Sequence, residues 1–231
     1  MPRFPTKEDF PSSITLSITP PPPSQPTTNI LLLLHGLGDT HTSFTQLGRQ
    51  LSLPETACIS IQAPTLLPFD LGGFHWGDDM VFDEATGEME MDTGFKPSTR
   101  MVLERVIKEG LVGKCGYKLR DIVIFGFGQG AMVSLNVAAE LGKEELGGVV
   151  SVGGYLPQQA PLPTIDGGKC KTPVLVCRGN RNSKFSEAKV RRLKDTFQFV
   201  EVKEWNKNGD GMPSNRAVSY THLTLPTNRE V

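Results

Sequence analysis

The chain has 231 residues and a formal net charge of -1 at pH 7. This length fits one α/β domain with a sizeable core, and the near-neutral charge gives no electrostatic reason to expect nucleic acid or anionic membrane as a partner. No apolar run approaches the roughly 20 residues of a membrane-spanning helix, and the N-terminal residues lack the apolar centre of a signal peptide. We therefore expect a cytoplasmic protein without integral membrane association.

Cysteine spacing gives no sign of a metal site or a disulfide framework. The cysteines are scattered along the chain without any C-x-x-C pair: Cys58, Cys115, Cys170 and Cys177. Buried free thiols are therefore favoured, and we expect neither a metal nor another cofactor.

The first third of the chain predicts an edge strand, a strand buried on both faces and a third strand. Residues 14–19 alternate in polarity, and the prolines at 20–23 then predict a stiff polyproline spacer. Residues 29–35 are apolar without alternation, which is typical of a strand buried on both faces, and residues 58–64 predict a third strand that stops at Pro64. A helix between them is indicated by apolar residues at i, i+3 and i+7: Phe44, Leu47 and Leu51.

The composition becomes acidic after Trp76, and no Lys or Arg occurs between Arg49 and Lys96. The acidic residues are Asp78, Asp79, Asp83, Glu84, Glu88, Glu90 and Asp92. A solvated surface insertion is favoured, and an acidic flap over a pocket is the alternative. Ser98 is the expected cap of the next helix, whose inward face is Leu103, Val106, Ile107 and Leu111.

A strand, a glycine turn and a helix follow one another at the centre of the chain. Residues 122–125 form the apolar run, the turn is Gly126-Phe127-Gly128-Gln129-Gly130, and the helix ends before Gly142. Two devices share this form: the nucleophile elbow G-x-S-x-G and the dinucleotide fingerprint G-x-G-x-x-G/A. The fingerprint needs an acid after the next strand, but residues 148–152 lead into Gly153-Gly154-Tyr155. The nucleotide-binding alternative is therefore disfavoured.

The remaining elements complete an α/β pattern. Residues 172–179 predict a buried strand, residues 186–197 an amphipathic helix, and residues 200–205 the last strand. Strands that alternate with helices specify a doubly wound, mostly parallel sheet with helices on both faces.

The segment from Val218 to Val231 differs in kind, because it resembles the translation of a sequencing adaptor. We exclude this tail from the fold. We expect an N-terminal segment at 1–28 and a domain at 29–217 that is truncated at its C-terminus, where one more helix would follow.

Motifs spread from Asn29 to Pro213 match one family in combination. They are Leu34-His35-Gly36-Leu37-Gly38-Asp39, Gln62-Ala63-Pro64, Trp76, Gly126-Phe127-x-Gln129-Gly130, and Gly147-Gly148-Val149-Val150 leading to Gly154-Tyr155-Leu156-Pro157. Together they resemble the phospholipase/carboxylesterase branch of the α/β-hydrolases, which includes the acyl-protein thioesterases and their fungal relatives. The resemblance implies an α/β-hydrolase fold and hydrolysis of esters or thioesters by a Ser, Asp, His triad.

The chain departs from this family at all three triad positions. The resemblance puts Gly128 at the nucleophile position and Asn182 at the acid position. It puts Ser214, in Gly211-Met212-Pro213-Ser214, at the position of the general base. Leu37 and Gln129 are still expected to offer backbone N–H groups to an oxyanion.

The remaining histidines and Ser134 are not expected to restore the triad. His35 should organise the oxyanion loop by hydrogen bonding, Ser134 lies too far past the turn to replace the nucleophile, and the other histidines are His41, His75 and His222. The leading hypothesis is a pseudohydrolase that binds an acyl, lipid or lipidated-peptide group without hydrolysing it. The alternatives are an active acyl-protein thioesterase or lysophospholipase-like hydrolase with an unorthodox catalytic residue, and a nucleotide-binding protein. The oligomeric state stays open.

Overall fold

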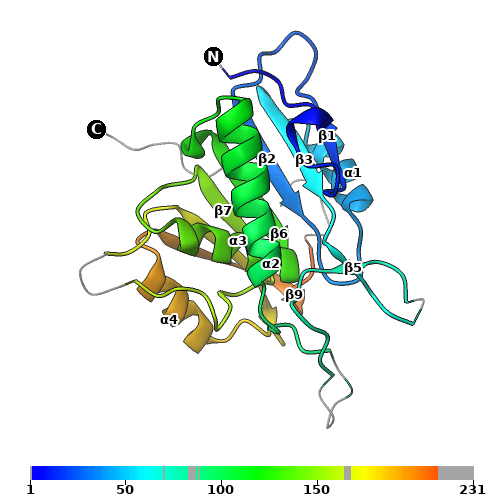
Figure 1. Cartoon of the computed structure of the whole chain (residues 1–231). Helices are drawn as coiled ribbons and strands as arrows, with labels where there is room; N and C mark the ends of the chain where they lie inside the picture. Colours follow the sequence, from blue (N-terminus) through cyan, green and yellow to red (C-terminus); the bar gives the residue numbers. More distant parts are fainter. Residues whose placement is uncertain (1, 70, 83–86, 88, 164–167, 213–231) are drawn as a thin grey trace.

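The computed structural model describes residues 2–69, 71–82, 87, 89–163 and 168–212. Within them, seven strands form one sheet in the order β1-β3-β2-β6-β7-β8-β9 (Figure 1). The strands are β1 (Leu16–Thr19), β2 (Asn29–Leu34), β3 (Thr56–Ile61), β6 (Ile122–Phe127), β7 (Gly148–Val152), β8 (Val174–Arg181) and β9 (Val200–Asn208). Neighbours in this sheet run parallel, except for edge strand β1, which is antiparallel to β3. The predicted α/β-hydrolase fold, with its mostly parallel sheet, is confirmed.

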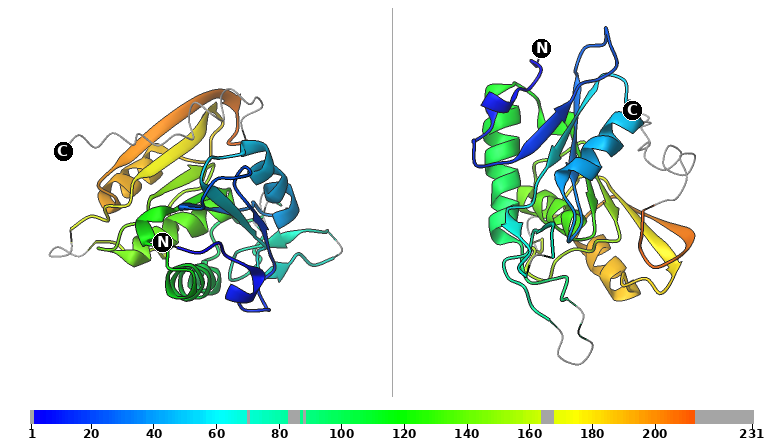
Figure 2. Two further views of the ribbon diagram at one scale, coloured as in Figure 1. Left: turned by 90° about the horizontal axis from the view of Figure 1, so that it is seen from above. Right: turned by 90° about the vertical axis from the view of Figure 1, so that its right-hand side faces the viewer.

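Helices cover both faces of the sheet, because successive side chains of each strand point to opposite faces. One face packs against α1 (His41–Leu51). The other packs against η2 (Met101–Lys114), α3 (Gln129–Leu141) and α4 (Glu187–Thr196), and α2 (Lys96–Arg100) contacts η2 and α3. Figure 2 shows α1 and the long helix η2 on opposite sides of the sheet. Short elements complete the described chain: η1 (Lys7–Asp9), β4 (Thr65–Leu66), β5 (Phe74–His75) and η3 (Leu119–Asp121).

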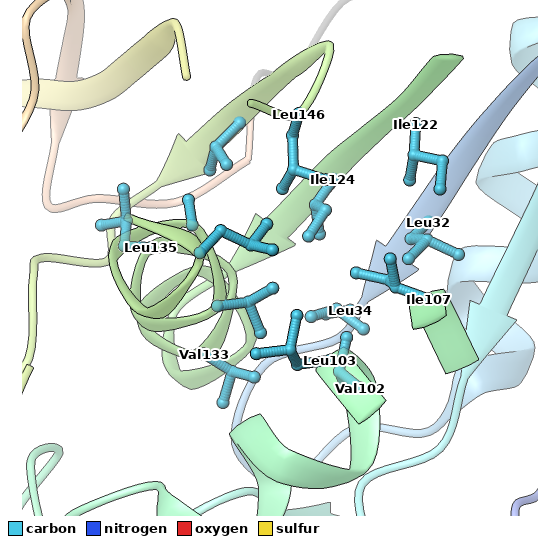
Figure 3. Close-up of a cluster of buried hydrophobic side chains, with 14 of the residues drawn as sticks. Leu32, Leu34, Val102, Leu103, Ile107, Ile122, Ile124, Val133, Leu135 and Leu146 are labelled. Atoms are coloured by element: carbon cyan, nitrogen blue, oxygen red, sulfur yellow. The ribbon is translucent and has the colours of Figure 1, made fainter. Parts of the chain in front are cut away.

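The larger core lies between the central strands and the helices α3 and η2 (Figure 3). Leu32 and Leu34 of β2 and Ile124 of β6 face Val133 of α3 and Ile107 of η2, and all five are fully buried. The apolar runs read from the sequence therefore form the two-faced buried strands that were expected. This packing fixes the strand ends that carry the candidate site.

The start of the helical segment formed by α2 and η2 differs from the sequence-based expectation. Ser98 does not cap this segment, because α2 already begins at Lys96 with Pro97 in its first turn. Proline suits a first helical turn, where its missing N–H leaves no bond unmade. The buried hydroxyl of Ser98 instead donates to the carbonyl of Trp76 at 2.6 Å. The segment continues into η2, which is wound as a π-helix.

Two further expectations can be compared with the described residues. The four cysteines are free and buried, as predicted. None of the helices described here is long and apolar enough to cross a membrane. Ser214 and the tail from Val218 to Val231 lie outside the described residues.

The strand order creates a switch point next to β2. The chain passes from β2 to β3 on one side of it and later returns to β6 on its other side. Loops that leave β2 and β6 in opposite directions open a crevice at the carboxyl edge of the sheet, where α/β proteins bind ligands. The two glycine-rich motifs of the sequence, at residues 36–38 and 126–130, follow these two strands.

Candidate functional site: an elbow without a nucleophile

Gly128 forms the sharp turn between β6 and α3. Its backbone has φ 53° and ψ -119°, a conformation that side-chain-bearing residues rarely adopt. The N–H of Gly128 donates to Val152 of β7 at 2.9 Å, and its carbonyl accepts from Ala131 and Met132 at 3.1 Å. The turn is therefore fastened both to the neighbouring strand and to the first turn of α3.

The three glycines of this turn differ in the space around them. A β-carbon on Gly126 would stand 2.4 Å from the Cα of Ala131, and one on Gly130 would stand 2.4 Å from the carbonyl oxygens of Leu34 and His35. A β-carbon on Gly128 would have its nearest neighbours at 3.7 and 3.8 Å, which is ordinary contact. Gly126 and Gly130 are thus required by packing, whereas position 128 has room for a side chain.

Two backbone N–H groups lie at this turn without a protein acceptor. Within the described residues, neither Leu37 nor Gln129 donates its backbone N–H to another group of the chain. The loop of Leu37 approaches the elbow closely, because the Cα of Gly36 is 3.8 Å from the β-carbon position of Gly128. The expected oxyanion hole requires two such N–H groups, left without an acceptor among the described residues, beside the elbow.

His35 holds the loop that carries Leu37. Its Nε2 accepts from the N–H of Ala63 at 3.0 Å, so its proton resides on Nδ1, which donates to the carbonyl of Gly36 at 2.7 Å. Burial lowers the pKa of His35, which keeps the ring neutral near pH 7. The indole N–H of Trp76 donates to the carbonyl of His35 at 2.8 Å. Both ring nitrogens are therefore engaged in holding the loop, as expected.

The side chain of Gln129 links the elbow to the acidic segment. Its Oε1 accepts from the backbone N–H of Trp76 at 3.1 Å, and its Nε2 donates to the carbonyl of Met91 at 3.4 Å. We call residues 89–94 the strap. Its Met91 places the side-chain methyl 3.7 Å from the β-carbon position of Gly128. The strap therefore lies against the elbow and partly covers it, since Gly128 remains partly exposed.

Beyond the strap, the acidic segment projects from the body of the molecule (Figure 1). Its described part pairs as a hairpin, in which Phe82 bridges to Met89 and Glu90 donates its N–H to Val81 at 2.8 Å. The described part of the segment is therefore an exposed insertion, as favoured by the sequence, and its base contacts the elbow. Asp83, Glu84 and Glu88 lie outside the described residues.

Asn182, the acid position expected from the family resemblance, lies at the same edge of the sheet as the elbow but carries an amide. Asn182 follows β8 with φ 51°, and its Nδ2 donates to Oδ1 of Asn208 at 2.8 Å. A carboxylate that the sequence analysis missed lies nearby: Asp210 accepts from the N–H groups of Gly179 at 3.1 Å and Lys184 at 2.9 Å. The position of Asp210 directly after the last parallel strand was the signal for it.

The other candidate groups are occupied or enclosed. His41 contacts Oε1 of Gln62 through Nδ1 at 2.6 Å, and the hydroxyl of Ser134 donates to the carbonyl of Gly130 at 2.7 Å inside α3. His75 is buried, and its Nδ1 has no hydrogen-bond partner among the described residues. Burial lowers the pKa of His75. No cluster of three or more metal-binding side chains occurs in the described part of the chain.

Comparison with known proteins decides between the elbow and the dinucleotide fingerprint. A model of the family described as Phospholipase/Carboxylesterase matches residues 20–211. The chain belongs to this family. An uncharacterized hydrolase of Schizosaccharomyces pombe is 35% identical over 201 residues, covering 84% of this chain and 80% of that protein. Acyl-protein thioesterase 1 of Debaryomyces hansenii is 31% identical over 169 residues, covering 68% of this chain and 70% of its own.

Solved structures confirm the fold of this phospholipase/carboxylesterase family member. Esterase PE8 superposes with a TM-score of 0.70 at 18% identity, over 90% of this chain and 96% of its own. Acyl-protein thioesterase 2 of Zea mays superposes with a TM-score of 0.60 at 22% identity, over 89% of this chain and 95% of its own. The turn at Gly128 is accordingly the elbow of an α/β-hydrolase fold.

Proposed function

We propose that this member of the phospholipase/carboxylesterase family is a pseudohydrolase, which binds an acyl, lipid or lipidated-peptide group without hydrolysing it. The observation that carries the proposal is Gly128: the elbow conformation is kept and a β-carbon would fit, yet no nucleophile is present. Asn182 cannot stabilise an imidazolium as a carboxylate does, and Ser214 stands where the family has its general base.

The expected loss in the rate of ester hydrolysis is large enough to distinguish a pseudohydrolase from an active hydrolase. Removal of a complete serine triad lowers the rate by about 10⁶-fold and leaves roughly 10³-fold over water, from the oxyanion hole and binding. The free N–H groups of Leu37 and Gln129 supply this remainder, because they need no particular side chain. Such N–H groups can still donate hydrogen bonds to the carbonyl of a bound ester, so the protein can bind an ester that it does not hydrolyse. We place this function in the cytoplasm.

The test is a matched set of activity measurements on the full chain. We expect no saturable hydrolysis of short p-nitrophenyl esters or of acyl thioesters, and no covalent labelling by a fluorophosphonate probe. An active acyl-protein thioesterase serves as the positive control for both assays. The variant Gly128→Ser should remain inactive, because its new hydroxyl has no general base to remove the proton.

Two results would replace this proposal. A burst of product stoichiometric with the protein, or fluorophosphonate labelling of the unchanged chain, would indicate an active ester or thioester hydrolase with an unorthodox nucleophile. A rise in melting temperature with NAD or NADP, but none with fatty acids, would instead support the nucleotide-binding alternative. A dinucleotide at 100 times its dissociation constant would raise the free energy of unfolding by about 2.7 kcal/mol, which a thermal-shift measurement detects easily.

A further inference from the structure

A cavity of about 600 Å³ lies beside the elbow, between the strap and helix α4. Its wall on the strap carries Glu90 and Asp92, and its wall on α4 carries Lys189 and Arg192. Tyr155, which is 8% exposed, lies between them. The volume falls within the range of small-molecule sites. None of these five residues belongs to the triad positions.

The two carboxylates of the cavity bind backbone N–H groups. Oδ2 of Asp92 accepts from the N–H of Gln158 at 2.8 Å, and Oε1 of Glu90 accepts from the N–H of Asp92 at 3.1 Å. The bond from Gln158 fixes the strap against the loop after β7, and the other lies within the strap. Among the described residues, neither carboxylate has a cationic partner within ion-pair distance.

The two cations on the facing wall bind carbonyl groups and an aromatic ring. Lys189 donates to the carbonyl of Lys184 at 2.9 Å, and its Nζ lies 3.3 Å from the ring centroid of Tyr155. Arg192 donates to the carbonyls of Pro157 and Gln158 at 3.0 and 2.7 Å. The Nε of Arg192 is buried and has no hydrogen-bond partner among the described residues.

These four charges face one another across the cavity without pairing. No ion pair within 4.0 Å joins any of them to another described residue. Burial lowers the pKa of Lys189, while the fields of Asp92 and Glu90 act in the opposite direction, so the charges share one partly enclosed space. Asp92, Lys189 and Arg192 are partly buried, Glu90 is exposed at the rim, and none of the four has an oppositely charged partner within ion-pair distance among the described residues. A partly buried charge without an opposite charge is unfavourable, and a ligand of matching charge removes that disadvantage.

We propose that this cavity binds a small dipolar ion, with its ammonium group at Glu90 and Asp92 and its anionic group at Lys189 and Arg192. A simple anion would meet the two carboxylates, and a metal ion would meet the two cations, so each single-charge ligand is opposed by one wall. The anionic group is a carboxylate or a phosphate, since both accept hydrogen bonds from Lys and Arg. The site is independent of hydrolysis at the elbow.

Calorimetric titration of the full chain tests this proposal. Glycine, glycylglycine and triglycine form a series in which ammonium and carboxylate are progressively farther apart, and O-phosphoethanolamine provides the phosphate arm. We expect saturable binding of at least one of these compounds. The N-acetyl derivative and the amide of the same peptide, each with one charge removed, should bind about tenfold more weakly. For a phosphate ligand, ethanolamine and inorganic phosphate are the single-charge controls.

Variants on each wall assign the two ends of the ligand. Lys189→Gln should weaken binding of the dipolar compound about tenfold. It should leave the affinity for the peptide amide, or for ethanolamine, unchanged, because these compounds lack the anionic group. Glu90→Gln should also weaken binding of the dipolar compound about tenfold. It should leave the affinity for the N-acetyl derivative, or for inorganic phosphate, unchanged, because these compounds lack the ammonium group. Lys194→Gln and Asp195→Asn remove the same charges from exposed positions of α4 and should have no effect. Circular dichroism confirms that each variant is folded.

Each outcome of the titrations either supports or overturns the proposed dipolar-ion site. Binding by the peptides alone identifies a carboxylate ligand, and binding by O-phosphoethanolamine alone identifies a phosphate ligand; both support the proposal. Absence of binding by all four compounds overturns it. So does equal binding of dipolar and singly charged compounds, or a loss with Lys194→Gln as large as that with Lys189→Gln. Hydrolytic activity at the elbow would not affect any of these results, so the two proposals fail separately.

Discussion

The side-chain methyl of Met91 lies 3.7 Å from the position that a β-carbon on Gly128 would occupy. This contact joins two segments that are far apart in the sequence: the base of the acidic hairpin and the glycine turn of the elbow. A side chain at position 128 would fit under Met91, in ordinary van der Waals contact with it. The elbow therefore has space for a nucleophile and is partly covered by the strap.

The backbone conformation of Gly128 leads to the first prediction. Because φ 53° and ψ -119° are unfavourable for a residue with a β-carbon, Gly128→Ser should lower the free energy of unfolding by about 1–3 kcal/mol. Gly128→Ala should lower the free energy of unfolding by a similar amount. The strain lies in the backbone, and the space around position 128 accepts a β-carbon. Urea denaturation of both variants beside the parent measures the effect.

Gly130→Ala is the comparison that separates strain from collision. Its β-carbon would stand 2.4 Å from two backbone carbonyl oxygens, so this variant should be destabilised more than either change at Gly128. Equal denaturation midpoints for the parent and Gly128→Ala would mean that the turn is not a strained elbow. The match to the hydrolase family at residues 126–130 would then have to be abandoned.

The coverage of the elbow by the strap leads to a second prediction. A cysteine introduced by Gly128→Cys should react slowly with iodoacetamide, and addition of Met91→Ala should accelerate the reaction, because the group above the thiol has been removed. Met80→Ala shortens another methionine of the acidic segment and should leave the rate unchanged. Equal rates with and without Met91→Ala would show that the strap does not protect the elbow.

The native cysteines permit this measurement because they should not react in the folded protein. Burial raises the pKa of Cys58 and Cys115 to about 11 and that of Cys177 to about 12, and Cys170 is also buried. Thiolates are the reactive form of cysteine, so these residues contribute little near neutral pH. The parent protein without Gly128→Cys gives the background rate.

The elements that carry the elbow could be predicted from the sequence for local reasons. The apolar run at 122–125 and the helical spacing after Gln129 are properties of neighbouring residues, and they produced β6 and α3. The requirement for glycine at 126 and 130 is long-range in part, since Gly130 packs against the end of β2. It was nevertheless predictable, because the motif as a whole resembles that of a known family.

The position of the strap could not be predicted in the same way. It depends on the amide of Gln129, which joins Trp76 to Met91 across the fold, and no pattern within the acidic segment reveals this contact. The carboxylate of Asp210 was missed for a similar reason, because its partners Gly179 and Lys184 belong to an earlier loop. Ser98 was misplaced because the same residue type caps helices and also bonds distant carbonyls.

The bridging amide of Gln129 gives a third prediction. Gln129→Leu removes the group that accepts the hydrogen bond from the backbone N–H of Trp76. Because Trp76 is fully buried, this N–H would be left unsatisfied, and the free energy of unfolding should fall by about 1–3 kcal/mol. Gln46→Leu, at an exposed position of α1, is the matched control and should change stability little. If the two variants denature at the same urea concentration, the bond from Trp76 contributes nothing to stability.

The last prediction concerns Asp9, which anchors the N-terminal segment. Its carboxylate accepts from the guanidinium of Arg3 and, at 2.8 Å, from the backbone N–H of Thr6. The hydrogen bond from Arg3 is the main reason that the pKa of Asp9 lies well below its usual range. An unfolded chain has the ordinary value of about 4, so the unfolded state takes up the proton first as the pH falls. The stabilisation by Asp9 is therefore complete above about pH 4 and is lost at lower pH.

Asp9→Asn should consequently lower the free energy of unfolding by about 1–3 kcal/mol near neutral pH, because it weakens a buried, charge-assisted pair of hydrogen bonds. The difference from the parent should shrink as the pH falls below about 4, since the unfolded parent then binds a proton at Asp9 that the folded parent takes up only at still lower pH. Urea denaturation of both proteins across this range measures the effect, and Asp195→Asn, at an exposed site on α4, controls for the loss of any carboxylate. A difference that stays constant with pH would show that the charge of Asp9 does not stabilise the fold.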